Sequence, residues 1–310
     1  MCKIGRYKPF FISFLLFLFS TFLSHAEPVT TVRAAEKAYQ HLVILGDPHL
    51  PGNYLESKKK AIETINSWND VDTVVAVGDL CEDRCTHEEL GAVKTFFTGL
   101  KQPFLPIVGN HDYLYDDRLN AKGKRHKAGA DIRDAKLRTF RELFGLKENS
   151  YDKKVGNYFL IFISPDAPEN LAALSQKQME WLRLELDNNK KRATIIFFHA
   201  PLEGTVRNNN PNFSAQPSGR IHDLLMEYPQ VFLWVSGHTH TTPKDESFAS
   251  EINVYEKRIT NIHNSDMNRD AIWTNSLFLY PDKVVVKTFN HKKGVWLPEF
   301  ERVVVPPKIQ

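Results

Sequence analysis

Cysteine is scarce in this sequence, and beyond the first 26 residues neither sign of charge is in excess. Only 3 of the 310 residues are cysteine. The formal net charge of +3 is carried by Lys3, Arg6 and Lys8. The remaining chain is close to neutral and has no electrostatic footprint for nucleic acid. Glycine (15), proline (17) and charged residues (25%) occur in globular proportions, which excludes a largely disordered chain, a collagen repeat and a coiled coil.

Long hydrophobic runs are missing after residue 23. The run Phe10–Leu23 has 14 residues, whereas a membrane-spanning helix needs about 20. Basic residues precede this run and Ser24-His25-Ala26 follows it, which is the three-part layout of a secretory signal peptide. We therefore expect a signal peptide at residues 1–26, cleaved near Ala26/Glu27, and a single mature domain at residues 27–310. The protein would then be secreted or periplasmic, without membrane contact after cleavage. An uncleaved membrane anchor is the alternative.

Two cysteines, Cys81 and Cys85, remain after such cleavage. A pair in an oxidising compartment can form a disulfide. A helix would hold their β-carbons about 5–6 Å apart, farther than the roughly 3.5–4.5 Å that a disulfide requires. A bridge therefore requires a loop at these positions, and the sequence leaves a disulfide and free thiols equally open.

Five short apolar runs are typical of buried strands, and each is followed by polar residues. Helical patterns lie between them, and the spacing of about 30 residues suits strand-helix-strand units. In open α/β sheets, ligands bind beyond the carboxyl ends of the strands, so we expect these polar residues to meet. The runs and the polar residues after them are Leu42–Leu45 with Gly46-Asp47-Pro48-His49, Val71–Val77 with Gly78-Asp79, Phe104–Val108 with Gly109-Asn110-His111-Asp112, Thr194–Phe198 with His199, and Val231–Val235 with Ser236-Gly237-His238-Thr239-His240.

The remaining chain is less informative. A polar, basic insertion spans Tyr113–Gly145, with a helical stretch near Asp131–Phe144. Its basic run Lys122–Lys127 predicts a solvated face rather than a lid over the site. Residues Gly204–Gly219 are rich in Asn, Pro, Ser and Gly, which predicts a long mobile loop. Strand patterns continue from Leu277 to Val305.

The residues at the strand ends form a mixed donor set of two Asp, one Asn and four His, which suits Mn, Fe or Zn. Enough donors are present for two divalent or mixed-valence ions, held about 3.5–4 Å apart and activating water for attack at phosphorus. No single motif is specific for such a site, but the set of five motifs in this order is specific.

With these motifs the chain resembles the calcineurin-like metallophosphoesterases, whose signature is Asp-x-His, Gly-Asp-x-x-[Asp/Glu/Asn], Gly-Asn-His-[Asp/Glu], a later His and Gly-His-x-His. The resemblance implies an α/β fold in which two packed mixed β-sheets are flanked by helices, a four-layer sandwich. It also implies the metal ligands. Asp47, His49 and His240 would hold one ion, Asn110, His199 and His238 would hold the other, and Asp79 would bridge both.

The resemblance also assigns His111 to catalysis. This residue would stabilise the developing charge and protonate the leaving alkoxide. Glu82 matches the carboxylate that orients this histidine and raises its pKa, and Asp112 is the rival for that role. Asn110 and His111 would contact the substrate. Arg207 and Arg220 flank the expected loop and are candidate phosphate contacts, since a guanidinium matches two phosphate oxygens.

At some motif positions this sequence differs from related groups of phosphoesterases, and these differences narrow the expected type of metal site and substrate. Purple acid phosphatases have glycine at the position of His49 and tyrosine at that of Glu82, so an iron-tyrosinate site is not expected. Cyclic-nucleotide phosphodiesterases of the family often have His-His where this chain has Phe198-His199. This difference weakens the prediction of a cyclic substrate without excluding it.

The sequence therefore predicts an exported hydrolase of phosphoric ester bonds, in which a metal-bound hydroxide attacks phosphorus. The alternative is a phosphodiesterase for cyclic nucleotides or phospholipid head groups. A non-catalytic scaffold on the same fold is a further alternative. The sequence leaves open the substrate, the native metal pair and the oligomeric state.

Overall fold

The computed structural model describes residues 1, 5, 37–207 and 210–309. The expected signal peptide, residues 1–26, lies outside the described residues except for Met1 and Gly5. The expected start of the mature chain at Glu27 lies outside them as well. None of the helices in the described parts of the chain is long and apolar enough to cross a membrane.

The first of two six-stranded sheets combines a parallel half with an antiparallel half. Its parallel half consists of neighbouring strands from the N-terminal third of the chain, and its antiparallel half comes from the C-terminal segment. In spatial order the strands are β12 (Val295–Val304), β11 (Val284–Asn290), β10 (Trp273–Leu279), β1 (Gln40–Leu45), β2 (Thr73–Ala76) and β3 (Phe104–Pro106).

The second sheet also has six strands and is parallel at its centre. Four strands in the middle run parallel, and one antiparallel strand closes each edge. In spatial order they are β4 (Tyr151–Val155), β5 (Tyr158–Phe162), β6 (Ala193–Phe197), β7 (Val231–Ser236), β9 (Ile259–His263) and β8 (Val254–Tyr255). Both sheets are mixed, which confirms the expected fold class.

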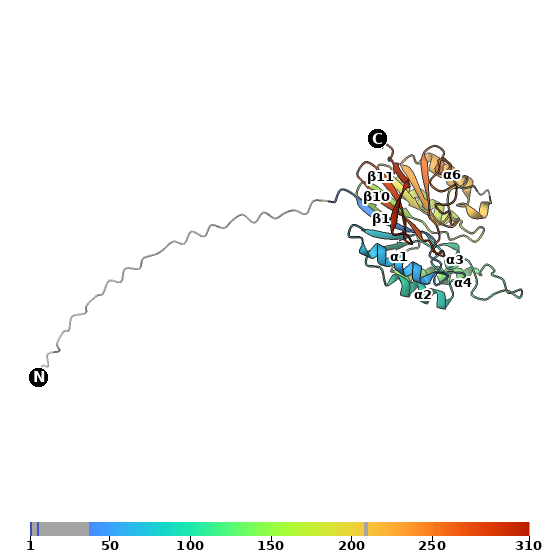
Figure 1. The fold of residues 1–310 in the computed structure, drawn as a ribbon, viewed down its shortest axis with the longest axis horizontal. Helices are drawn as coiled ribbons and strands as arrows, with labels where there is room; N and C mark the ends of the chain where they lie inside the picture. The colour runs from blue at the N-terminus through green and yellow to red at the C-terminus, as the bar shows by residue number, and fades with distance from the viewer. Residues whose placement is uncertain (2–4, 6–36, 208–209, 310) are drawn as a thin grey trace. The chain divides into compact units, whose positions relative to one another are not determined.

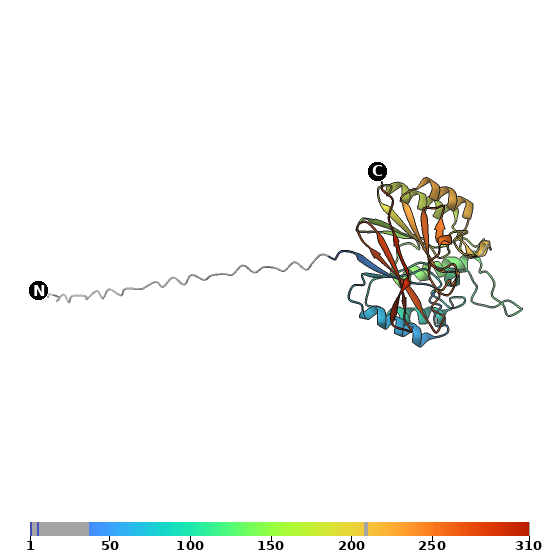
Figure 2. The same cartoon turned by 45° about the horizontal axis from the view of Figure 1, so that its top comes forward.

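Alternate side chains along each strand face two different cores, as the period of a strand requires. In β1, Leu42 and Ile44 pack between the sheets, while Val43 and Leu45 pack against helices. The first sheet is covered on its outer face by α1 (Leu55–Ser67), α2 (His87–Phe97) and α4 (Ala130–Phe144). The second sheet is covered by α5 (Gln176–Asn188) and α6 (Ser218–Glu227). Figures 1 and 2 show helices on both outer sides of the strands.

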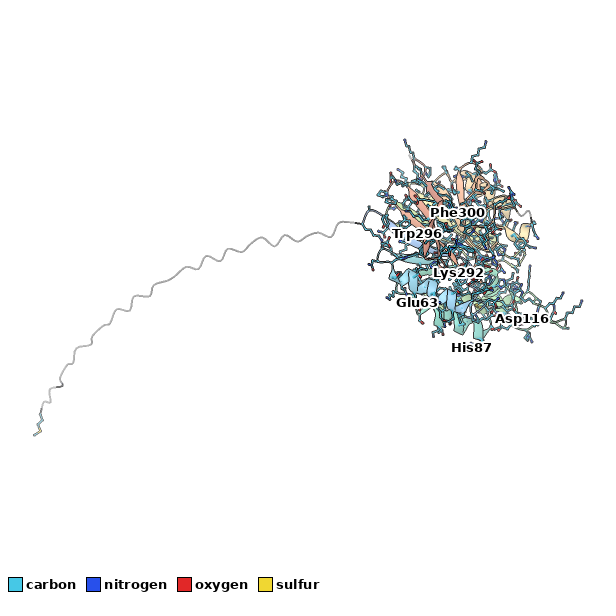
Figure 3. All side chains as sticks on the ribbon, in the orientation of Figure 1. Glu63, His87, Asp116, Lys292, Trp296 and Phe300 are labelled. Carbon is cyan, nitrogen blue, oxygen red and sulfur yellow. A yellow bond between two sulfur atoms is a disulfide. The ribbon has the colours of Figure 1, made fainter. Side chains whose placement is uncertain are left out.

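The labelled side chains in Figure 3 follow this layering. Glu63 on α1 and His87 at the start of α2 lie on one helical side, and Trp296 and Phe300 lie on β12. A short helix α3 (Asn110–Tyr113) directly follows β3. The 3-10 helices η1 (Pro211–Phe213) and η2 (Glu251–Asn253) complete the described elements.

Two local expectations are resolved by the structure. The Gly204–Gly219 segment holds η1 and the first two residues of α6, so its described part is more ordered than the predicted mobile loop. Residues 208–209 of this segment are outside the described residues. Cys81 and Cys85 form a disulfide with their α-carbons 5.0 Å apart. The segment between them is a loop, which meets the geometric condition for a bridge.

Candidate metal centre

The polar residues that follow five strands meet at one edge of the two sheets. The donor atoms of Asp47, His49, Asp79 and His240 lie within 4.8 Å of one another, and so do those of Asp79, His199 and His238. Asp79 belongs to both groups. The amide oxygen of Asn110 lies 3.0 Å from His199 Nε2. All seven side chains predicted as ligands are therefore brought together.

The first group turns two imidazole nitrogens toward each other. His49 Nε2 lies 3.2 Å from His240 Nε2, and His240 Nε2 lies 3.1 Å from Asp47 Oδ2. The other nitrogen of each ring has a partner of its own. His49 Nδ1 lies 3.1 Å from the Glu82 carbonyl oxygen, and His240 Nδ1 lies 3.1 Å from Asp266 Oδ2. A histidine that ligates a metal commonly engages its second nitrogen in this way.

In the second group, too, one nitrogen of each histidine ring has a partner outside the group. His199 Nδ1 donates to the Val77 carbonyl oxygen at 2.8 Å, so its Nε2 faces Asp79 Oδ2 at 3.3 Å. His238 Nε2 donates to the Asn212 carbonyl oxygen at 2.8 Å, which leaves its Nδ1 for the centre. The rings of His199 and His238 lie 4.6 Å apart, measured between their centroids.

The hydrogen bonding of the Asp47 carboxylate shows whether this donor set fits a cation. Its side chain is completely buried, and its Oδ2 accepts a hydrogen bond from the backbone N–H of His238 at 2.7 Å. Its Oδ1 has no hydrogen-bond partner. A buried carboxylate oxygen without a donor is costly, and a metal ion would satisfy it. The donors are imidazole nitrogens and hard oxygens, which suit Mn, Fe or Zn.

The electrostatic field of the group is negative. Burial alone would lower the pKa of His240, but the carboxylates of Asp266 and Asp47 raise the pKa to about 10. Burial also disfavours charge on His199, whose pKa is nevertheless raised to about 9 by Asp79 and Asp47. A field that holds protons on these rings attracts metal cations for the same reason.

Backbone strain is concentrated at the same residues. His49, Asp79, His238 and His240 all have φ between 46° and 64°, a left-handed conformation that is uncommon for residues other than glycine. Such conformations gather at functional sites, where the surrounding structure maintains them. The strain therefore gives independent support to a site at these strand ends.

Two glycines allow the carboxylates to approach the backbone. A β-carbon at Gly109 would collide with the Asp79 backbone N and its Oδ1, and one at Gly237 would collide with Asp47 Oδ1. Glycine is therefore required next to each of these two aspartates, because the carboxylate occupies the space of a side chain.

His111 borders the group without lying inside it. Its backbone N–H donates to Asp79 Oδ1 at 2.8 Å, while its Nε2 is 3.9 Å from Asp79 Oδ2. Its side chain is 16% exposed, and burial lowers its pKa to about 4. The ring also packs edge-on against His49, at 4.9 Å between centroids. This histidine therefore combines contact with the group and access to solvent.

The carboxylates expected to orient His111 have other partners. Glu82 Oε2 accepts from the Gly52 N–H at 3.0 Å, and Glu82 reaches His49 only through its backbone carbonyl oxygen. Asp112 accepts from the N–H groups of Gly109 and Cys81 at 2.8 and 2.9 Å. Burial raises the pKa of Asp112 to about 7. In the structure both carboxylates accept from backbone N–H groups of the loops around the centre, and none of their described hydrogen bonds joins them to the His111 ring.

The two candidate arginines pair elsewhere. Arg207 forms an ion pair with Glu246. Arg220 donates to Gln176, in a groove that α5 and α6 line on the outer side of the second sheet. In the described residues Arg220 is therefore not brought to the ligand groups. The described contacts of Arg207 do not join it to the ligand groups either.

Sequence reasoning missed Asp266 and Arg125. Asp266 orients His240 and itself pairs with Arg269. It lies three residues beyond the end of β9. Its position after a further strand is the signal that could have identified it. Arg125 lies in the basic run of the insertion, which was predicted as a solvated face. Its guanidinium Nη1 is 3.2 Å from His111 Nδ1.

Comparisons with known proteins agree with this geometry. The family model described as calcineurin-like phosphoesterase matches residues 41–242. The 3',5'-cyclic adenosine monophosphate phosphodiesterase CpdA of Escherichia coli K12 is 22% identical over 234 residues, covering 69% of this chain and 74% of that protein. A dimetal phosphatase from Danio rerio superposes with a TM-score of 0.60 at 13% identity, covering 87% of this chain and all of that one.

Further solved structures share the fold. Purple acid phosphatase PPD1 from yellow lupin, Lupinus luteus, has a TM-score of 0.57 at 14% identity, over 87% of this chain and 54% of that one. Plasmodium GAP50, described as the anchor in the inner membrane complex, has a TM-score of 0.55 at 15% identity, over 88% and 90% of the two chains.

The two mixed sheets and the convergent Asp, Asn and His side chains define the class of metal-dependent phosphoesterases. The chain belongs to the calcineurin-like phosphoesterase family. It is a hydrolase that acts on phosphoric ester bonds.

Proposed function

We propose that this protein is a phosphoesterase with a dinuclear metal centre. Asp47, His49 and His240 would hold one ion, and Asn110, His199 and His238 would hold the second. Asp79 would bridge the pair. The observation that carries the proposal is that two groups of donor atoms share Asp79. Two divalent or mixed-valence ions of Mn, Fe or Zn suit these donors.

The residues around the centre have distinct tasks in the proposed reaction. Metal ions in such a site polarise the phosphoryl oxygens and lower the pKa of water. As the oxygen of water bonds to phosphorus, the bond from phosphorus to the leaving oxygen breaks. A ring nitrogen of His111 would deliver the proton that this leaving oxygen requires. Asn110 and His111 are adjacent at the start of α3, and both would contact the substrate.

Hydrolysis by the purified protein tests the proposal. We expect release of p-nitrophenol from p-nitrophenyl phosphate or bis-p-nitrophenyl phosphate with Mn²⁺ or Zn²⁺, and loss of release with a chelator. Asp79→Asn should abolish activity, since it removes charge from both metal positions. Asp282→Asn is the matched control, because Asp282 is exposed in the turn between β10 and β11. Absence of hydrolysis and of bound metal in the wild-type chain would favour a scaffold instead.

A cyclic-nucleotide phosphodiesterase is the second candidate. The observation that favours it is the 22% identity to an E. coli protein named as a cyclic adenosine monophosphate phosphodiesterase. Cyclic AMP in the same assay separates the two candidates. Turnover of cyclic AMP above that of p-nitrophenyl phosphate would select the diesterase, and the reverse order would select the monoesterase.

We also propose that the enzyme is exported. Support comes from the basic and apolar pattern of residues 1–26 and from the Cys81–Cys85 disulfide, because disulfides persist in oxidising compartments. N-terminal sequencing of protein from a secreting host should find Glu27 first. A full-length chain that stays in the cytosol would contradict export.

A further inference from the structure

The insertion after α3 forms a projecting hairpin with a strongly basic character. Residues Tyr115 and Lys127 pair across its base, and the Asn120 N–H donates to the Lys124 carbonyl oxygen at 2.9 Å near its tip. The hairpin extends outward beside α4 in Figures 1 and 2, and Figure 3 labels Asp116 at its base. The stretch 117–127 has one carboxylate, Asp117, and five cationic side chains: Arg118, Lys122, Lys124, Arg125 and Lys127.

Arg125 points from this hairpin to His111. Its Nη1 lies 3.2 Å from His111 Nδ1 and 3.3 Å from His111 Nε2. An atom in the ring plane at equal distances from both nitrogens would collide with the carbon between them. The guanidinium nitrogen therefore lies over the face of the imidazole and not in line with either ring nitrogen.

Two further contacts hold the guanidinium in place. Its central carbon lies 4.7 Å from the centroid of the Tyr115 ring, and its Nη1 lies 3.0 Å from Asp83 Oδ1. The Arg125 side chain remains 40% exposed, so it is accessible to solvent beside His111. The other basic residues behave differently. Arg118 is 85% exposed and pairs with Asp116, and Lys127 donates to the Pro168 carbonyl oxygen.

We propose that Arg125 is a specificity-determining residue that selects substrates with an anionic group on the leaving side. This inference rests on the proposed function, in which His111 gives its proton to the leaving oxygen. A guanidinium over the His111 ring then lies beside the leaving group. Its free N–H groups match two oxygens of a carboxylate or phosphate. Asp83 holds the guanidinium in place until such an anion arrives.

A pair of matched substrates tests the role of Arg125. Ethyl phosphate and phosphoglycolate differ only in the replacement of a methyl group by a carboxylate, and phosphate release measures both. We expect the wild-type enzyme to prefer phosphoglycolate, judged by the ratio of kcat/KM. Arg125→Ala should reduce this ratio by roughly ten- to a hundredfold, the effect of losing hydrogen bonds to a charged group. Arg125→Lys should retain part of the preference.

The control is Arg118→Ala, which removes the same charge from the same hairpin and should leave the ratio unchanged. An unchanged ratio in Arg125→Ala would overturn the inference. If both substrates lost activity equally, the cation would act on the transferred phosphoryl group instead. Failure of the proposed function is a separate result, recognised by a wild-type enzyme that does not hydrolyse p-nitrophenyl phosphate. Titration calorimetry with the same two compounds then decides whether Arg125 binds the carboxylate.

Discussion

Each imidazole of the centre is oriented by a partner outside the ligand set. The carbonyl oxygens of Glu82, Val77 and Asn212 engage His49, His199 and His238, and the Asp266 carboxylate engages His240. Because one nitrogen of each ring is occupied, the other is directed toward the centre. The fold itself therefore sets the orientation of these four rings.

His111 differs from these residues, because it is adjacent to the group and not part of it. We predict that His111→Ala lowers kcat by about 10²–10⁴-fold, the usual contribution of a general acid. The loss should be smaller for p-nitrophenyl phosphate than for ethyl phosphate, because nitrophenolate leaves without a proton. Steady-state kinetics with both substrates measures the difference.

Metal content is the control for this variant. His111→Ala should bind as much metal as the wild-type protein, measured by inductively coupled plasma mass spectrometry. Loss of a metal ion in the variant would contradict the assignment of His111 as a proton donor and would make it a ligand.

At the scale of elements, the motifs were predictable because the chemistry is local to strand ends. Gly78-Asp79 follows β2 and Gly237-His238 follows β7, and both could be placed from an apolar run that stops at a polar turn. Parallel pairing then brings the ends together without further information. The same logic would have found Asp266 after β9, had the pattern of Ile259–His263 been recognised as a strand.

The partners of side chains in loops could not be predicted this way. The role expected for Glu82, which was to orient His111, depended on where two loops meet. In the structure the Glu82 carboxylate accepts a hydrogen bond from the backbone N–H of Gly52. Arg125 lies in an insertion without hydrophobic periodicity, so nothing in the sequence indicated that it faces His111. Such contacts depend on long-range packing rather than on local pattern.

The close approach at Gly109 gives a prediction at this scale. Gly109→Ala would place a β-carbon against the Asp79 carboxylate. We expect a loss of about 1–3 kcal/mol in the free energy of unfolding, typical of overpacking, together with weaker metal binding. Chemical denaturation and metal titration measure the two effects.

Gly91→Ala is the matched control for this substitution. Gly91 lies within α2, and a β-carbon there would meet no atom within 4 Å. Alanine should therefore stabilise the helix by roughly 0.5–1 kcal/mol. A Gly109→Ala protein as stable as Gly91→Ala would show that the carboxylate does not need the space.

At the scale of the whole domain, the centre joins the two sheets. Asp47, Asp79 and Asn110 follow strands of the first sheet, and His199, His238 and His240 follow strands of the second. The sequence predicted the two sheets only through a family resemblance, because the strand order within each sheet depends on pairings between distant segments such as β1 and β10.

A buried histidine away from the centre predicts how stability depends on pH. His263 in β9 is 1% exposed, and burial together with nearby Arg302 lowers its pKa to about 4, although its bond to the Thr205 carbonyl oxygen opposes this. The unfolded chain has the ordinary histidine pKa of about 6.5, so it binds more protons between pH 6.5 and 4. The free energy of unfolding should therefore decrease as the pH falls through this window.

His263→Gln tests this contribution, because glutamine can donate to Thr205 but does not titrate. At about 1.4 kcal/mol per pKa unit, the histidine accounts for at most about 3 kcal/mol of the decrease. Urea denaturation at several pH values should give a shallower pH dependence for the variant. An identical slope in both proteins would mean that His263 takes up protons equally in the folded and the unfolded chain.

The count of metal ions per chain tests the central claim most directly. The purified protein would be loaded with Mn²⁺, freed of excess metal and analysed by inductively coupled plasma mass spectrometry beside Asp79→Asn. A shared aspartate between two ligand groups predicts about two ions per wild-type chain and loss of both in the variant. A wild-type chain that retains no metal, or an Asp79→Asn chain that retains both ions, would contradict the assignment.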